Sequence, residues 1–197
     1  MFVLKFYGQE RLTKKEMASS KYFKFLDTAV DVYFGITLFT LFLSFPGWQQ
    51  VSSVILFFHL MLFFLFTWWE LRTIEQIPKH YFIDFILIGL SMFALTQAIN
   101  ELDNIRAYVG WLLGFLLIDM ASQAIDWWVH RPRRSEQRFL RFFLIDDGVL
   151  SAFYILALLL IDELSIFSAI AISLPFIIST YLSILFRTTE LRAKYIV

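Results

Sequence analysis

Six apolar stretches, each long enough to cross a lipid bilayer as an α-helix, constrain this chain more than any other feature. A helix rises about 1.5 Å per residue and the hydrocarbon layer is about 30 Å thick, so a span needs roughly 20 apolar residues. Short connections between the stretches favour antiparallel neighbours. The predicted spans lie at 22–45, 51–69, 82–99, 108–129, 143–161 and 164–186. The sequence therefore predicts an all-α, polytopic membrane bundle of six transmembrane helices.

Composition supports the same class. Hydrophobic residues make up 59% of the 197 residues and 24 residues are Phe, whereas about 45–50% apolar residues is usual for soluble domains. The chain lacks the polar residues that a water-facing surface needs, so lipid is its expected solvent. There is no Cys, which excludes disulfides and thiolate metal sites. We expect a membrane domain, 21–187, between a cytoplasmic N-terminal segment, 1–20, and a cytoplasmic tail, 188–197.

The basic residues are strongly segregated. All but one of the 17 Lys and Arg residues lie near the N-terminus, in the second and fourth connections, or near the C-terminus, and the exception is Arg106. Lys and Arg concentrate in cytoplasmic loops of membrane proteins. The distribution therefore predicts that both termini are cytoplasmic and that the protein lies in the plasma (inner) membrane.

A weak internal repeat accompanies this layout. Three outward-running spans begin with FLD, FID and LIDD, and three inward-running spans end with WWELRTIE, DWWVHR and LFRTTELR. One interpretation is three repeated helical hairpins. The other is that every cytoplasmic interface favours aromatic and basic residues, which produces the same pattern without a repeat.

The first predicted span carries polar groups at helical spacing. Asp27 and Asp31 are four residues apart and therefore share one helix face. Tyr33, Thr37 and Thr40 continue a stripe of hydroxyl groups toward the far end of the span. Acids at one mouth and hydroxyl groups along the wall indicate a path for a cation.

Seven acidic residues lie within or just inside the predicted spans, whereas Lys24, near the start of the first span, is the one basic residue there. The acids are Asp27, Asp31, Asp84, Asp119, Asp126, Asp146 and Asp147. Ionised carboxylates in hydrocarbon are costly and often mark ion or proton pathways. Asp27, Asp84, Asp146 and Asp147 sit near predicted helix N-termini, where the helix dipole favours negative charge, so these four are interpreted as helix-end residues. Asp31 and Asp119 lie too deep for that explanation.

The fourth span has two unlike faces. Asp119 and Gln123 project along a polar face, whereas Gly110, Gly114 and Ala121 project along roughly the opposite one. Small residues allow close approach between membrane helices. Such a helix has little surface left for lipid, so we expect it to be central or to lie at the interface of a homo-oligomer.

His59 is the one histidine deep within a predicted span. A hydrogen-bonded contact between helices is the more common role for such a residue, and a ligand or proton relay is the less common one. On the fifth span, Ser151 and Tyr154 extend the polar face that begins at Asp147. These side chains are most simply interpreted as interhelical hydrogen-bonding groups.

Other function classes have little support. The motifs GxSxG, HExxH and the P-loop are absent, and no cofactor or metal site is predicted. Asp27 and Asp31 have the DxxxD spacing that membrane prenyltransferases use for Mg²⁺ and a diphosphate, but no second acidic motif accompanies it, so an enzyme is not favoured. The basic residues follow from topology and give no support to nucleic-acid binding.

The first span resembles a known family. Lys21, Phe25 and Asp27 match the basic-xxx-Phe-x-Asp pattern of the six-span potassium channels of bacteria and lysosomes, which carry a Phe-Ser-Asp signature on their first helix. Leu26 stands here in the place of the signature Ser. The resemblance implies a tetramer whose pore is lined by the first helix.

Three functions remain open from the sequence. In a monovalent-cation (K⁺) channel, Asp27 and Asp31 would concentrate cations at the cytoplasmic mouth, and Thr37 and Thr40 would line the path. In a proton-coupled transporter, Asp119 would exchange a proton for a cation. The third function is a non-conducting membrane module that binds a partner or lipid.

Overall fold

The computed structural model describes an all-helical chain, and its described residues contain no β-strand. Those residues are 28, 31–74, 81–130 and 134–195. A first helical segment covers Asp31–Leu43. Five further helices follow in order: α2 (Val51–Ile74), α3 (Tyr81–Asn100), α4 (Ile105–His130), α5 (Arg134–Leu160) and α6 (Ile166–Tyr195). The prediction of an all-α fold is confirmed for this part of the chain.

Every predicted span coincides with a helix, but two helices extend well beyond the apolar stretches. Helix α5 begins at Arg134 rather than at 143, and α6 continues to Tyr195 rather than ending at 186. The added turns are rich in Arg, Glu and Leu, which are good helix formers in water as well as in lipid. Hydropathy therefore located the helices but underestimated their length.

Four helices are long and apolar enough to cross a membrane, namely α2, α4, α5 and α6. The apolar stretches of the first segment, Asp31–Leu43, and of α3, Ile86–Asn100, are shorter. Large apolar side chains such as Leu159 and Phe167 are exposed on the outer surface. A surface of this kind suits lipid rather than water. The length and the apolar surface of these helices thus support the prediction of a membrane protein.

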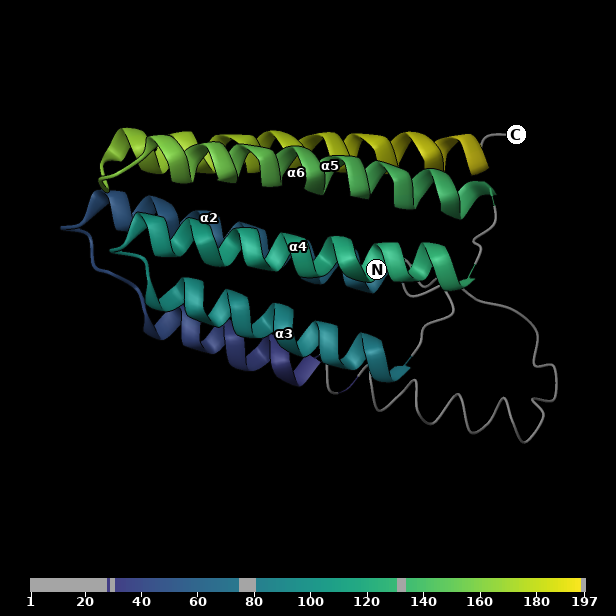
Figure 1. The fold of residues 1–197 in the computed structure, drawn as a ribbon, viewed down its shortest axis with the longest axis horizontal. Helices are drawn as coiled ribbons and strands as arrows, with labels where there is room; N and C mark the ends of the chain where they lie inside the picture. The colour runs from purple at the N-terminus through teal and green to yellow at the C-terminus, as the bar shows by residue number, and fades with distance from the viewer. Residues whose placement is uncertain (1–27, 29–30, 75–80, 131–133, 196–197) are drawn as a thin grey trace.

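The helices run nearly side by side along the long axis (Figure 1). In this view α5 and α6 lie above α2 and α4, and α3 and the first segment lie below them. Helix α4 packs against both α3 and α5, and α6 packs against α2 and α5. Helix α4 therefore lies between α3 and α5.

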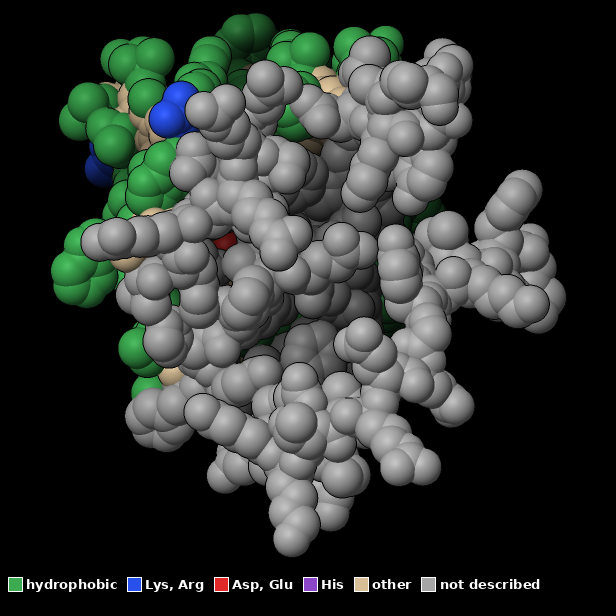
Figure 2. Space-filling view, turned by 90° about the vertical axis from the view of Figure 1, so that its right-hand side faces the viewer, with side chains coloured by type: hydrophobic (Ala, Val, Ile, Leu, Met, Phe, Trp, Pro, Cys, Tyr) green, Lys and Arg blue, Asp and Glu red, His purple; other side chains and the backbone are tan. Residues whose placement is uncertain are grey.

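The two ends of the bundle differ. At the right-hand end in Figure 1, which we call the terminal end, the first segment begins and α2, α4 and α6 finish. At the opposite end, α3 finishes and α4 and α6 begin. Figure 2 looks onto the terminal end, where the described side chains around the rim are mainly hydrophobic, with Lys or Arg side chains on one side.

Aromatic side chains fill the centre of the bundle around α2. Phe34 of the first segment packs on Phe64, with ring centroids 4.6 Å apart. Phe63 lies edge-on to Phe115 of α4 at 5.0 Å and stacks on Phe176 of α6 at 4.6 Å. Ring pairs at these separations contribute attraction beyond simple burial. They join three neighbours to α2 and set the positions of the polar groups between them.

A sharp turn connects the first segment to α2. Proline cannot continue a helix, and Pro46 follows the last turn of the segment. Gly47 has a φ of +76°, a left-handed conformation that residues with a Cβ adopt at a cost. Pro46 and Gly47 together end the helix and turn the chain, and Phe34 and Phe45 of the preceding residues pack against α2.

Candidate functional site

A polar cluster joins α4 to α5. Asp119 and Gln123 lie one turn apart on α4, and the Gln123 Nε2 group donates hydrogen bonds to Asp119 Oδ2 at 2.9 Å and to Asp147 Oδ2 of α5 at 2.7 Å. The amide group of Gln123 therefore joins the two carboxyl groups. We call Asp119, Gln123 and Asp147 the carboxyl cluster.

The carboxyl cluster lies within the apolar part of its helices. Asp119 precedes Ile125, the end of the apolar stretch of α4, by six residues, and Asp147 follows Arg141, the start of the stretch in α5, by six. Six residues correspond to about 9 Å along a helix axis. The Asp147 side chain is buried. At such depth an ionised carboxylate is costly unless a proton, a cation or hydrogen-bond donors compensate it.

The neighbouring acid, Asp146, faces α6. Its Oδ2 atom accepts a hydrogen bond from Ser179 Oγ at 2.6 Å and a longer one from Ser183 Oγ at 3.3 Å. Ser179 and Ser183 are four residues apart, so both hydroxyl groups project from one face of α6. Two adjacent acids of α5 are thus held by two different helices.

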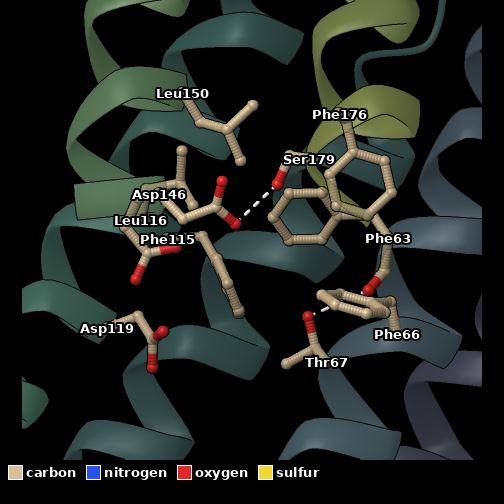
Figure 3. Close-up of a pocket in the computed structure, with 11 residues that line it drawn as sticks. Phe63, Phe66, Thr67, Phe115, Leu116, Asp119, Asp146, Leu150, Phe176 and Ser179 are labelled. Atoms are coloured by element: carbon tan, nitrogen blue, oxygen red, sulfur yellow. Dashed lines mark hydrogen bonds between the residues drawn. The ribbon is translucent and has the colours of Figure 1, made fainter. Parts of the chain in front are cut away.

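The three acids line one small cavity of about 20 Å³ (Figure 3). In the close-up, the carboxyl groups of Asp119 and Asp146 lie on one side and the rings of Phe63 and Phe176 on the other. The volume suffices for one water-sized species. The described residues that line it are Phe63, Phe66, Thr67, Phe115, Leu116, Asp119, Asp146, Asp147, Leu150, Phe176 and Ser179. Three carboxyl groups thus lie around one small cavity.

A second polar group lies nearer the opposite end. His59 of α2 is fully enclosed, and Tyr108 of α4 places its Oη atom 2.8 Å from His59 Nδ1. Tyr154 of α5 places its Oη atom 3.3 Å from His59 Nε2. Tyr108 also donates to the carbonyl oxygen of Leu56 at 3.2 Å. The sequence-based interpretation of His59 as a hydrogen-bonded contact between helices is confirmed.

Aromatic rings separate the two polar groups. Phe63 and Phe176 line the acid cavity and also lie against the His59 ring, with centroids 6.2 Å and 5.3 Å from it. Phe115 of α4 packs edge-on against Phe63. All three Phe side chains are buried. We call them the aromatic layer, and they lie between the cavity and the His59 ring.

The residues predicted to form a channel wall do not meet the carboxyl cluster. Asp27 lies outside the described residues. Asp31 and Tyr33 are exposed on the first segment, whereas Thr37 is buried against the rest of the bundle. The Thr40 hydroxyl donates to the carbonyl oxygen of Ile36 in its own helix at 2.9 Å. Within one chain, the hydroxyl stripe is therefore not a single polar wall.

The small residues of α4 lie on its outer face. A Cβ atom built at Gly110 or Gly114 would meet nothing within 4 Å, and Ala121 is exposed. The polar face with Asp119 and Gln123 points into the bundle, as the sequence predicted. Among the described residues, none packs closely on Gly110 or Gly114, so the packing role predicted for these small residues is not seen within this part of the chain.

The interpretation of Asp146 and Asp147 as helix-end residues is wrong. Helix α5 begins at Arg134, which places both acids more than three turns inside it. The dipole effect falls off within the first turn. The informative signal was the ladder Asp147, Ser151, Tyr154, whose spacing of four and three residues defines one buried face of α5.

Among the described residues, no group of three or more His, Cys, Asp or Glu side chains is arranged to hold a metal ion. Comparison of the chain with protein-family models, curated proteins and solved structures gives no match. Fold and site together describe an all-helical protein with four helices long and apolar enough to cross a membrane and with a carboxyl cluster between α4 and α5.

Proposed function

We propose that this protein is a six-span plasma-membrane transporter, with both termini in the cytoplasm, that exchanges protons for a monovalent cation at the carboxyl cluster. One observation carries the proposal: Asp119, Asp146 and Asp147 line one small cavity within the apolar parts of α4 and α5. Acids placed in this way are costly in lipid, and they are typical of ion and proton pathways.

Exchange at this cluster conserves charge. With a proton between Asp119 and Asp147, the pair carries at most one negative charge, which Gln123 Nε2 contacts on both sides. A monovalent cation bound between the carboxylates would replace the proton and leave the net charge unchanged. The Gln123 Oε1 atom is buried and accepts no hydrogen bond from the described residues, so it is a further oxygen ligand for a hard cation.

The aromatic layer supplies the closure that a transporter needs. A carrier exposes its binding site to one side of the membrane at a time, often by rocking helices around a fixed site. Phe63, Phe115 and Phe176 close the site toward the opposite end. Release of a cation toward that end requires this layer to open.

A channel lined by the first segment, as the potassium-channel resemblance implies, is the competing proposal. Asp31 and Tyr33 are exposed on the surface of a single chain, so such a pore needs several copies. Substitution of Asp31 separates the two ideas, because Asp31 lies on the first segment and the carboxyl cluster lies between α4 and α5.

The test uses purified protein in liposomes that contain a pH-sensitive dye. External K⁺ or Na⁺ is expected to enter in exchange for protons and to make the interior alkaline. Asp119→Asn and Asp147→Asn keep side-chain shape but cannot release a proton, so each should slow the exchange at least tenfold, about 1.4 kcal/mol. Glu163→Gln, on the exposed loop between α5 and α6, is the matched control and should keep the wild-type rate.

Three outcomes contradict the proposal. Exchange at the wild-type rate in both Asn variants would remove the carboxyl cluster from the mechanism. Flux lost in Asp31→Asn but kept in Asp119→Asn would favour the channel. No flux from folded wild-type protein under K⁺, Na⁺ and H⁺ gradients would exclude both transport functions and leave the non-conducting membrane module as the remaining function.

A further inference from the structure

A line of buried polar side chains continues from the carboxyl cluster toward the opposite end. Asp147, Ser151 and Tyr154 lie on one face of α5, and all three are buried. Ser151 is about 6 Å along the axis from Asp147 and about 4.5 Å from Tyr154. Tyr154 then contacts His59. Polar groups therefore continue along α5 past the level of the aromatic layer.

The proton positions around His59 follow from the hydrogen-bond partners. A carbonyl oxygen can only accept, so Tyr108 uses its one O–H on the Leu56 oxygen. The Tyr108 oxygen then accepts from His59 Nδ1–H, which leaves Nε2 as an acceptor for the Tyr154 O–H. Both ring nitrogens are occupied, and a ring with one N–H and one bare nitrogen can take up a proton on one side while releasing one on the other.

The network also approaches the polar pocket at the opposite end. That pocket, of about 540 Å³, is lined by Gln49, Gln50, Val51, Ser52, Ser53, Asp103, Leu164 and Ile166. Ser53 Oγ donates to Asp103 Oδ1 at 2.8 Å, and Ser53 precedes Leu56 by one turn of α2. The Tyr108 hydroxyl, bonded to Leu56, is therefore the first group of the network that a proton from this pocket would meet.

We propose that Tyr108, His59 and Tyr154 form a proton relay that connects the opposite end of the bundle to the carboxyl cluster through Ser151. This inference rests on the proposed proton–cation exchange and assigns the route by which the exchanged proton crosses the aromatic layer. The relay passes protons from one hydrogen bond to the next, a route that a metal cation cannot follow.

The transfer balances as follows. The relay starts with the Tyr108 O–H directed at His59 Nδ1 and the His59 Nε2–H directed at Tyr154. An incoming proton binds the Tyr108 oxygen, its previous proton moves to Nδ1, and the Nε2 proton moves to the Tyr154 oxygen. In the structure the Ser151 hydroxyl donates a weak hydrogen bond to Met120 Sδ at 3.8 Å. For the transfer it turns away from this sulfur, takes the earlier Tyr154 proton and releases its own proton to the ionised carboxylate of the cluster. One proton enters and one leaves, and the relay ends in the arrangement of the structure; rotation of the ring and of both hydroxyl groups resets it.

The experiment compares Tyr154→Phe and Tyr108→Phe with wild-type protein in the same liposomes. Each change removes one hydroxyl group and keeps the ring. The relay predicts that proton flux falls at least tenfold in both variants, while Na⁺ or K⁺ binding to the detergent-solubilised protein keeps its wild-type affinity. Tyr181→Phe, on the exposed face of α6, is the matched control and should behave as wild type.

The outcomes separate the relay from a purely structural network. Flux within twofold of wild type in both variants overturns the relay but leaves the exchange at the carboxyl cluster standing. A parallel loss of flux, cation affinity and thermal stability also overturns it, because it shows that the hydroxyl groups only hold the helices together. No proton flux in folded wild-type protein overturns the proposed function and the relay together.

Discussion

The hydrogen bonds between α5 and α6 allow a quantitative test of the site. Ser179→Ala removes a 2.6 Å hydrogen bond to Asp146, whereas Ser183→Ala removes one of 3.3 Å to the same oxygen. Hydrogen bonds to charged groups contribute about 1.5–3 kcal/mol in soluble proteins, but interhelical ones in membranes average about 0.6 and reach about 1.7 kcal/mol. We therefore expect Ser179→Ala to lower the free energy of unfolding by about 1–1.7 kcal/mol and Ser183→Ala by about 0.5 kcal/mol or less.

The double variant should lose more than the two single variants together. After one substitution Asp146 still has a donor, whereas after both its carboxyl group has lost both serine donors, and a buried group without donors carries a desolvation cost. Helix α6 should stay in place, since Phe142 and Phe186 still stack with centroids 4.3 Å apart. Reversible unfolding in mixed micelles, followed by circular dichroism, gives the three free energies.

Ser173→Ala is the matched control for this cycle. Ser173 is buried on the same helix, but its hydroxyl donates to the carbonyl oxygen of Ala169 in α6 itself at 2.8 Å. Such back-bonding contributes little to helix stability, so the control should unfold like the wild type. Equal losses for Ser183→Ala and Ser179→Ala, or a loss at Ser173 as large as at Ser179, would refute the assignment of the Asp146 partners.

Three further predictions use the same unfolding assay. Phe63→Ala should cost about 3–5 kcal/mol, because it opens a cavity where the ring stacks on Phe176; a loss below 1 kcal/mol would contradict a tight aromatic layer. Gly114→Ala should stabilise α4 by up to about 1 kcal/mol, since its Cβ would meet nothing, and destabilisation would instead reveal a partner on that face. Arg106→Ala breaks an exposed ion pair with Asp162 and should cost about 1 kcal/mol or less, with the difference shrinking as salt is added.

The positions of the helices could be predicted from the sequence because bilayer thickness and hydropathy act on each span separately. The ends of the helices could not be predicted, because the turns of α5 that precede 143 contain Arg and Glu. These residues are good helix formers in water, so the helix continues where the hydropathy falls. That difference in one boundary changed the interpretation of Asp147 from a helix-end residue to a member of the site.

Only the part of the site that lies on α4 could be predicted from the sequence. Asp119 and Gln123 stood out because polar side chains on one face of an apolar helix must point inward. Their partner on α5, Asp147, could not be identified, because hydropathy does not show which faces of two helices meet. Lipid is as apolar as a Leu side chain, so the pairing of helices depends on close packing and on hydrogen bonds between particular residues. The contact between His59 and Tyr108 was hidden for the same reason.

The hydrogen-bond partners of the buried acids link the fold to the proposed function, because they offset the free-energy cost of burying each carboxyl group. Asp146 receives donors from Ser179 and Ser183, so its charge is compensated by groups that stay in place. Asp119 and Asp147 share the amide of Gln123 instead, and in the proposed exchange they also share one proton. A proton is the only part of that arrangement that can leave without moving a helix, and a cation is what can replace it at equal charge. The difference in partners therefore predicts different phenotypes: Asp146→Asn should alter stability more than exchange, and Asp147→Asn should alter exchange more than stability.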